Sequence, residues 1–326
     1  MQATRITKPG EIVFVEIRDQ APRDGQVVVR PLCLSLCGSD VFHLFHMAAE
    51  EYPQPVGSSG HEMVGIVEKV GRGVAGIKEG ELALTLSPPH TAMTEQYVAE
   101  AECVLPIPRD RPIEELLMAQ QLGTVIYAAR RLPNLVGQSA AVIGQGSAGI
   151  LWAQLLRRLG CGRIMVMDVV DSRVEAGRRF GADLAFNNSR TDAVTEIRGA
   201  TGGRLADLVV EAAGEVESIN LAAHLVREKG ILFFFGVPHA RSFAFDYWTF
   251  YRTYAQTFSS GAAMLESGKG SFRLAIDLIA RRDVDVRGMV THRLPFRDVA
   301  RAFELAHTRT DGALKVMVEI PQGAKR

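Results

Sequence analysis

The chain has 326 residues, enough for about two domains that each bury a core without disulfide or metal staples. Hydrophobic residues make up 47% and charged residues 23%, and 37 basic residues balance 37 acidic ones. This zero formal charge argues against a basic surface for nucleic acid or anionic lipid, and it favours a small, roughly neutral substrate or one locally charged cleft.

The four cysteines are dispersed, without the paired Cys-x-x-Cys spacing of a disulfide framework or of a four-cysteine zinc lobe. No apolar run approaches the roughly 18 residues that a membrane helix needs, and the first residues do not read as a leader. We therefore expect reduced thiols, a cytoplasmic protein and no membrane partner.

Residues 1–122 are rich in glycine, proline and valine and break into short alternating apolar runs, a pattern typical of an all-β, barrel-like unit. Within it, Cys37, His61 and Glu62 lie close in sequence. Brought together by folding, a thiolate, an imidazole and a carboxylate form an open zinc site, with one position left for water or substrate. Taken singly, Cys37 also fits a small buried hydrophobic residue, His61 a hydrogen-bonded core histidine, and Glu62 a solvent-exposed charge.

From residue 123, helical and strand patterns alternate at the spacing of βαβ units. A strand-like run at 139–143 precedes Gly-Gln-Gly-Ser-Ala-Gly at 144–149, a helical pattern at 150–159, and a second strand at 163–167. That strand ends at Asp168. A Gly-x-Gly-x-x-Gly turn in this setting, followed about 20 residues later by an acid, is the dinucleotide fingerprint. Asp168 would bond the adenosine ribose and repel a 2′-phosphate, which favours NAD over NADP.

Each position of the glycine turn has a physical role. Gly144 allows the tight turn, Gly146 lets the backbone approach a pyrophosphate, and Gly149 permits close packing of helix on strand. The phosphates would lie against backbone N–H groups at the positive end of the helix, where Ser147 and Ala148 stand.

The alternation continues to about residue 260 and predicts a doubly wound Rossmann sheet of six parallel strands with helices on both faces. The simplest architecture inserts this α/β nucleotide-binding domain, residues 123–265, between two parts of one β-rich domain, 1–122 and 266–326. The edge of the sixth strand, near 255–260, could pair across a two-fold axis, so we expect a homo-oligomer.

The chain resembles the medium-chain dehydrogenase/reductase superfamily, in its zinc-dependent alcohol and polyol branch, which is sorbitol dehydrogenase-like. The motifs that carry the resemblance span nearly the whole chain: Cys37-Gly38-Ser39-Asp40, Gly60-His61-Glu62, the 144–149 turn, Asp168, Val290-Thr291-His292-Arg293-Leu294-Pro295 and Leu314-Lys315-Val316-Met317-Val318. The resemblance implies a GroES-like barrel domain, zinc and NAD as cofactors, and hydride transfer between NAD and an alcohol.

The resemblance also implies roles for single residues. Cys37, His61 and Glu62 would be the zinc ligands, with water as the fourth. Ser39 would pass the substrate proton toward solvent. Asp40 would orient the ligand histidine, because a metal-bound imidazole needs its other N–H fixed.

On the cofactor side, the resemblance places Lys315 at the pyrophosphate and Arg173 beside the adenosine. Gly236 ends a strand at the edge where such sheets bind their ligand. For Lys315 the alternative is an edge-strand lysine whose ammonium reaches water.

Three features depart from the branch. Where polyol dehydrogenases carry a metal-side Glu-Pro-Leu, this chain reads Gln-Gln-Leu at 120–122. A neutral amide is a poor zinc ligand, so either Glu62 and a water bonded to Gln120 complete the site, or metal binds weakly. The relay histidine should fall at Phe42. His43 on a strand would face the other side, which leaves water or His46 as the proton exit.

The third departure is the missing four-cysteine structural zinc lobe, since only a short segment, residues 82–91, intervenes. The candidates for lining the substrate site are Phe42, Phe45, His46, Tyr52 and His90.

The predicted reaction is reversible oxidation of a secondary alcohol, polyol or sugar-like substrate to a ketone or aldehyde. Two alternatives stay open. One is a zinc-free reductase of enones or quinones, against which Asp168 and the Cys37 motif argue. The other is a catalytically inactive nucleotide-binding regulator, suggested by Gln120 and Phe42.

Overall fold

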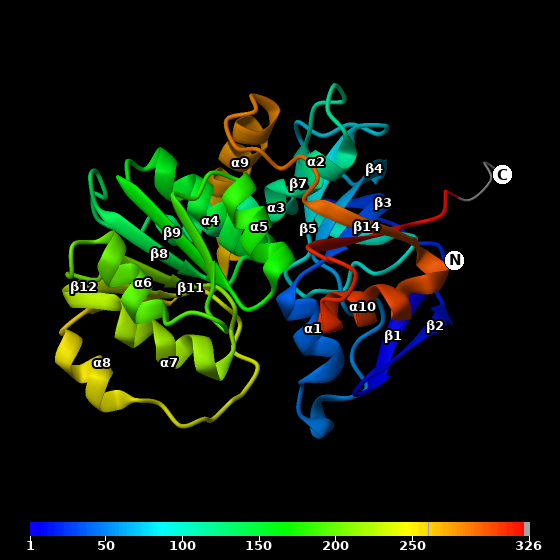
Figure 1. Cartoon of the computed structure of the whole chain (residues 1–326). Helices are drawn as coiled ribbons and strands as arrows, with labels where there is room; N and C mark the ends of the chain where they lie inside the picture. The colour runs from blue at the N-terminus through cyan, green and yellow to red at the C-terminus, as the bar shows by residue number, and fades with distance from the viewer. Residues whose placement is uncertain (260, 323–326) are drawn as a thin grey trace. The chain divides into compact units, whose positions relative to one another are not determined.

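The computed structural model describes residues 1–259 and 261–322 (Figure 1). The chain divides into two compact units, one made of Met1–Thr124 with Met264–Arg326 and the other of Val125–Ala263. The first division falls inside helix α3 (Ala119–Ala129). Among the described residues, none of the helices combines the length and the apolar character needed to cross a membrane.

The second unit is the predicted doubly wound α/β structure. Its strands are β8 (Ser139–Ile143), β9 (Arg163–Asp168), β10 (Leu184–Asn187), β11 (Ala206–Glu211), β12 (Val226–Phe234) and β13 (Gln256–Ser259). They form one parallel sheet in the order β10-β9-β8-β11-β12-β13, so the strand order reverses between β8 and β11. This confirms the six-stranded Rossmann prediction. The reversal is the point where such sheets bind ligands, beyond the carboxyl ends of the strands.

Helices cover both faces of this sheet, which is why its strands read as continuous apolar runs. The helices are α4 (Ser147–Arg158), α5 (Asp171–Arg179), α6 (Ala193–Ala200), α7 (Val216–Leu225) and α8 (Tyr247–Thr253). Trp152 of α4 packs on Phe233 of β12, with ring centroids 5.2 Å apart. The preceding strand residue, Leu232, belongs instead to a core cluster with Ala222 and Leu225 of α7. Neighbouring residues of one strand therefore pack against different helices.

The first unit is β-rich. Its strands are β1 (Gln2–Lys8), β2 (Glu11–Glu16), β3 (Gln26–Leu36), β4 (Glu62–Val70), β5 (Leu82–Leu86), β6 (Tyr97–Glu100), β7 (Val104–Pro106), β14 (Val290–Pro295) and β15 (Lys315–Glu319). Seven of them form a sheet in the order β14-β15-β3-β4-β5-β7, with β6 paired to β3, while β1 and β2 form a hairpin. The end of β3 thus lies between the start of β4 and the start of β15.

The helices of this unit are α1 (Gly38–Phe45), α2 (Ile113–Leu117), the first half of α3, α9 (Gly270–Ala280) and α10 (Val299–Thr308). Short 3₁₀ turns are Ala49–Glu51, Ala101–Cys103, Ala263–Leu265, Ser267–Lys269 and Phe296–Asp298. Helix α1 corrects the prediction that His43 lies on a strand. Asp40 in its first turn accepts the Cys37 N–H at 2.9 Å, and Val41 and Leu44, three residues apart, are buried. These are helix signals: an acid at the positive end and an apolar face.

Helix α8 has no counterpart among the predicted elements. It begins at Asp246, whose carboxylate accepts the Thr249 N–H at 3.0 Å as an N-terminal cap. It exposes the apolar side chains of Tyr247, Trp248 and Tyr251 while Phe250 packs against the core, so its apolar residues do not mark one buried face. The expected sixth strand is present as β13, and Ser260 lies outside the described residues. The expected homo-oligomer stays a prediction.

Helix packing inside the first unit gives a test of this fold. An added Cβ at Gly123 of α3 would lie 2.3 Å from the ring of Phe272, a fully buried residue of α9. Alanine in a helix interior normally stabilises by about 1 kcal/mol relative to glycine, whereas overpacking costs about 1–3 kcal/mol. The added Cβ would also lie 2.9 Å from the Phe272 Cα, so the overpacking cost should fall at the upper end of this range. We therefore expect Gly123→Ala to lower the free energy of unfolding by about 1–2 kcal/mol in urea titrations.

The control is Gly199→Ala in α6, where an added Cβ meets nothing within 4 Å. It should leave the unfolding free energy unchanged or raise it. A Gly123→Ala protein as stable as the wild type would contradict the close packing of α3 on Phe272.

Candidate active site

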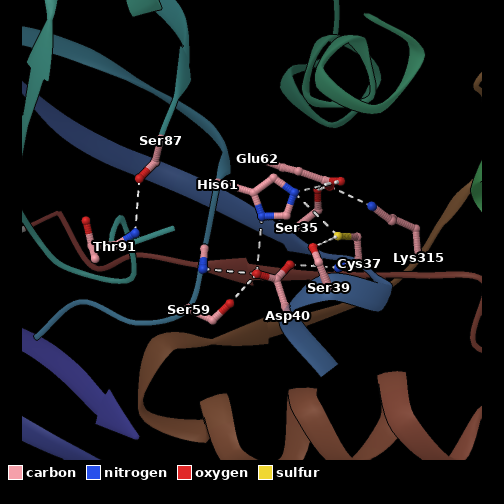
Figure 2. A network of polar contacts seen from close by, with 11 residues as sticks. Ser35, Cys37, Ser39, Asp40, Ser59, His61, Glu62, Ser87, Thr91 and Lys315 are labelled. Atoms are coloured by element: carbon pink, nitrogen blue, oxygen red, sulfur yellow. Dashed lines mark hydrogen bonds and ion pairs between the residues drawn. The ribbon is translucent and has the colours of Figure 1, made fainter. Parts of the chain in front are cut away.

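Three side chains of the first unit converge at the junction of β3, α1 and β4 (Figure 2). The Cys37 Sγ lies 3.4 Å from the His61 Nε2, which lies 3.9 Å from the Glu62 Oε1. The three ligand atoms all lie within 4.8 Å of one another. Tetrahedral zinc with bonds of about 2.0–2.3 Å needs ligand atoms roughly 3.6 Å apart. The donor set and its spacing therefore fit zinc, and Cys37 is only half-buried while His61 and Glu62 are buried.

Asp40, completely buried on α1, holds this arrangement in place. Its carboxylate accepts the N–H of Cys37 at 2.9 Å, the N–H of Gly60 at 3.0 Å and the hydroxyl of Ser59. It also lies 3.3 Å from the Nδ1 of His61. Because Nδ1 faces Asp40, the Nε2 of His61 faces the Cys37 sulfur. The predicted metal-site geometry thus depends on one carboxylate that joins α1 to the segment before β4.

The charges in this cluster support one another. Burial alone would raise the pKa of Asp40, but the charge and hydrogen bond of His61 outweigh it and hold that pKa well below its ordinary value. Burial alone would lower the pKa of His61, but the charges of Cys37 and Asp40 raise it well above its ordinary value. The negative charges of Asp40 and Cys37 therefore favour a positive charge beside them, and a bound metal cation would supply one.

Glu62 is held from its other side by a buried lysine. The Lys315 Nζ lies 2.5 Å from the Glu62 Oε2, and both residues are 1% exposed. The Ser35 hydroxyl bonds to the same oxygen. Cross-strand register explains this meeting, since Ser35 on β3 pairs with Glu62 on β4 and with Met317 on β15. The remaining oxygen, Oε1, is the one that faces His61.

The position of β15 in the sheet excludes one interpretation of Lys315. Strand β15 lies between β14 and β3, so Lys315 is not an edge-strand lysine that reaches water. The expected contact of Lys315 with a cofactor pyrophosphate stays a prediction.

Ser39 and Gln120, the other candidates of the first unit, differ in their contacts with the three ligand residues. The Ser39 Oγ lies 2.9 Å from the Cys37 Sγ, beside the half-buried side of the site. Gln120 is buried on α3, and within the described part of the chain no hydrogen bond joins its amide to the three ligand residues. Its expected bond to a metal-bound water stays a prediction.

Sequence reasoning did not find Ser35 or Ser59, and it gave His90 no role beyond a possible substrate lining. The His90 ring centroid lies 4.1 Å from that of His61. Burial, together with the neighbouring His61, lowers the pKa of His90 to about 3. The signal available for Ser35 was its place near the end of a predicted strand, two residues before Cys37.

The glycine turn of the second unit has the geometry that the fingerprint predicts. Gly144 has φ +89°, in the left-handed region, and its Cα position abuts Ala213, since an added Cβ would lie 2.9 Å from the Ala213 Cβ. An added Cβ at Gly149 would lie 1.8 Å from the Gly144 carbonyl oxygen. Gly146 precedes α4 without a side-chain cap, so the N–H groups at Ser147 and Ala148 are available to an anion.

The other cofactor candidates surround this turn. Asp168 accepts the N–H of Gln145 at 2.7 Å through one oxygen and that of Val170 at 2.9 Å through the other. The Arg173 guanidinium comes within 3.8 Å of an added Cβ at Gly146. At Gly236, an added Cβ would lie 2.4 Å from the backbone nitrogen of Gly214, in the loop after β11. The glycine turn, Asp168, the loop at Gly214 and Gly236 thus lie at the carboxyl ends of β8, β9, β11 and β12, respectively.

Comparisons with known proteins agree with this geometry. Residues 23–108 match the family described as alcohol dehydrogenase GroES-like domain, and residues 148–281 match the zinc-binding dehydrogenase family. An alcohol dehydrogenase of Cupriavidus necator is 28% identical, with 98% of each chain covered. A probable D-xylulose reductase A of Neosartorya fischeri is 25% identical over 89% of this chain and 87% of its own.

Among solved structures, zinc dependent alcohol dehydrogenase 2 from Streptococcus pneumonia superposes with a TM-score of 0.86, at 21% identity and with both chains fully covered. At that identity the likeness shows the fold. With both domain families in order, full-length relatives, and the Cys37, His61 and Glu62 cluster in place, the chain belongs to the medium-chain dehydrogenase/reductase superfamily, in its zinc-type, sorbitol dehydrogenase-like branch.

Proposed function

We propose that the protein oxidises a secondary alcohol, polyol or sugar-like substrate to a ketone or aldehyde, reversibly, with zinc in the first unit and NAD in the second. The observation that carries the proposal is the meeting of Cys37, His61 and Glu62 at zinc-ligand spacing. The name of the Neosartorya fischeri relative, a D-xylulose reductase, supports a polyol or sugar-like substrate.

Zinc, when bound, supplies a Lewis acid that lowers the pKa of an alcohol and polarises a carbonyl. Cys37, His61 and Glu62 would hold it. Asp40 keeps the His61 Nε2 turned to the site by bonding its Nδ1. The Ser39 hydroxyl, 2.9 Å from the Cys37 sulfur on the half-buried side, would relay the substrate proton: its Oγ would accept that proton while its own hydroxyl proton passes to solvent water.

The second unit would bind the dinucleotide through three features. The open N–H groups at the start of α4 would bond the pyrophosphate, and Gly146 would let it approach. Each oxygen of Asp168 accepts one backbone N–H and so keeps a lone pair for a ribose hydroxyl. Its negative charge supports a preference for NAD. Arg173 lies close enough to Gly146 to contribute a cation.

Removing the thiolate tests the metal site. We expect Cys37→Ser to lose zinc and to lower kcat/KM more than about 100-fold, because even residues that only support zinc ligands cost about 10–100-fold. NADH affinity, measured by fluorescence titration, should stay within about threefold of the wild type, since Cys37 lies in the other unit.

The control for this substitution is Cys161→Ala, a buried thiol of the second unit, which should keep both zinc and turnover. Full activity of metal-free Cys37→Ser protein would refute the zinc mechanism and favour a zinc-free reductase.

The charge of Asp168 is testable through cofactor choice. A charge pair about 4 Å apart near a protein surface is worth about 1–4 kcal/mol, and 1.4 kcal/mol is tenfold. We expect Asp168→Asn to shift the ratio of kcat/KM for NAD to that for NADP at least about tenfold toward NADP. The lost backbone hydrogen bond affects both cofactors alike and cancels in this ratio. Asp171→Asn is the control, because that exposed acid pairs with Arg190. An unchanged ratio in Asp168→Asn would contradict the assignment.

Lys315 supports Glu62 in this proposal, and its loss is testable without metal. Removing one partner of a buried ion pair costs about 3–5 kcal/mol, because the other charge is left uncompensated. We expect that loss in metal-depleted Lys315→Met protein, and a smaller loss in the Lys315→Met, Glu62→Gln double variant. Lys69→Met is the control, since its exposed pair with Asp19 should cost under about 1 kcal/mol.

Lys315→Met also separates support of Glu62 from a contact with the cofactor pyrophosphate. A protein of unchanged stability that binds NADH more than about tenfold more weakly would contradict the supporting role.

A further inference from the structure

Three imidazoles lie in a row beside the candidate metal site. The ring centroids of His61 and His90 are 4.1 Å apart, with the planes 33° from parallel. Behind His90, the ring of His43 on α1 lies 5.0 Å away at 54°. Ring pairs usually have centroids about 4.5–7 Å apart, so at 4.1 Å and 33° the His90 ring lies directly against the His61 ring. His90 therefore covers one face of the ring that supplies a ligand atom of the site.

A strained loop delivers His90 to this place. His90 has φ +54°, in the left-handed region, which costs a residue other than glycine about 1–2 kcal/mol. The loop is closed by a hydrogen bond of 2.8 Å from the His90 N–H to the Ser87 carbonyl, and one of 3.0 Å from the Thr91 N–H to the Ser87 hydroxyl. The Thr91 carbonyl packs so tightly on Gly57 that an added Cβ there would lie 2.2 Å from its oxygen. The surroundings hold a conformation that His90 alone would not adopt.

The His90 ring is not placed by its own hydrogen bonds. The Nδ1 atoms of His90 and His43 are buried, and neither has a hydrogen-bond partner among the described residues. The closest ring contact of His90 is with His61, and the His43 ring lies farther away and more steeply tilted.

A second cation site is the other reading of this cluster, because Asp40, His61 and His90 each offer a ligand atom within 4.8 Å of the others. The hydrogen bonds argue against it. One oxygen of Asp40 already accepts from Ser59 and Gly60 and lies beside the His61 Nδ1, and the other accepts from Cys37. These donors take up the Asp40 Oδ1, the oxygen beside the His61 Nδ1, and the other nitrogen of His61 faces Cys37.

The bond from Asp40 does not fix the His61 ring by itself. At 3.3 Å it is longer than the 2.7–3.2 Å of ordinary N–H···O bonds, and the ring torsion of histidine has a broad energy minimum. A ring lying on the face of His61 restricts the rotation that this hydrogen bond leaves open.

We propose that His90 is a positioning residue for the metal ligand His61, which it holds by face contact so that the His61 Nε2 stays directed at the cation. The proposal rests on the proposed zinc site. It deepens that site by adding the short loop of residues 87–91 to the structure that supports it.

The test compares two substitutions at this position. His90→Asn removes the ring and keeps a residue that tolerates the left-handed conformation, whereas His90→Phe keeps a ring and removes both nitrogens. The readouts are the zinc dissociation constant of metal-depleted protein in competition with a chromophoric chelator, and the visible absorption of the Co²⁺-substituted protein.

We expect His90→Asn to weaken zinc binding about 10–100-fold and to alter the Co²⁺ spectrum, as loss of a group that orients a metal ligand does. His90→Phe should return both to near the wild type. The matched control is His307→Ala, whose imidazole stacks on Phe45 at 4.3 Å and touches none of the three ligand residues. It should change neither readout.

Three results would overturn the proposal. His90→Asn protein with wild-type zinc affinity and spectrum would show that the ring has no positioning role. His90→Phe as weak as His90→Asn would assign the effect to the nitrogens. Loss of one of two zinc ions in His90→Asn would make His90 a ligand of a second site. A wild-type protein that binds no zinc would instead refute the proposed function, before any variant is compared.

Discussion

The buried carboxylate of Asp40 is the group on which the first unit's site depends. Its acceptor oxygens meet donors from Cys37, which caps the start of α1, and from Ser59, Gly60 and His61 in the segment before β4. A carboxylate without solvent must have its oxygens satisfied, so these donors cannot separate without a large penalty. The same bonds that satisfy Asp40 bring the Cys37 sulfur and the His61 Nε2 to 3.4 Å. Folding of this junction and assembly of a zinc-type site are therefore one event.

Charge balance explains why a buried lysine, Lys315, lies behind Glu62. A thiolate and a glutamate would give zinc two negative ligands, and Lys315 adds a buried positive charge on the far oxygen of Glu62. Because that oxygen is ion-paired with Lys315 and accepts the hydroxyl of Ser35, Glu62 presents its other oxygen to the site. Such support from behind a ligand is how proteins orient metal-binding groups and tune the ion. The pair is costly to bury, and its position beside the proposed metal site gives a reason for that cost.

Local spacing made the nucleotide-binding unit predictable. The glycine turn, α4 and Asp168 follow one another within 25 residues, so their contacts are set by short-range geometry. The ligand motifs around Cys37 and His61 were visible for the same reason. The partnership of Lys315 with Glu62 was not, because it depends on the register of β15 on β3 and of β3 on β4, across about 250 residues. His43 was misplaced on a strand because the helix signals of α1 occupy only eight residues.

The central claim is that Cys37, His61 and Glu62 bind one zinc ion. X-ray absorption at the zinc edge of wild-type protein, purified without chelators, tests it most directly. The account predicts one sulfur ligand at about 2.3 Å and three nitrogen or oxygen ligands at about 2.0–2.2 Å. Absence of zinc, a site with two or more sulfurs, or a site with no sulfur would contradict it.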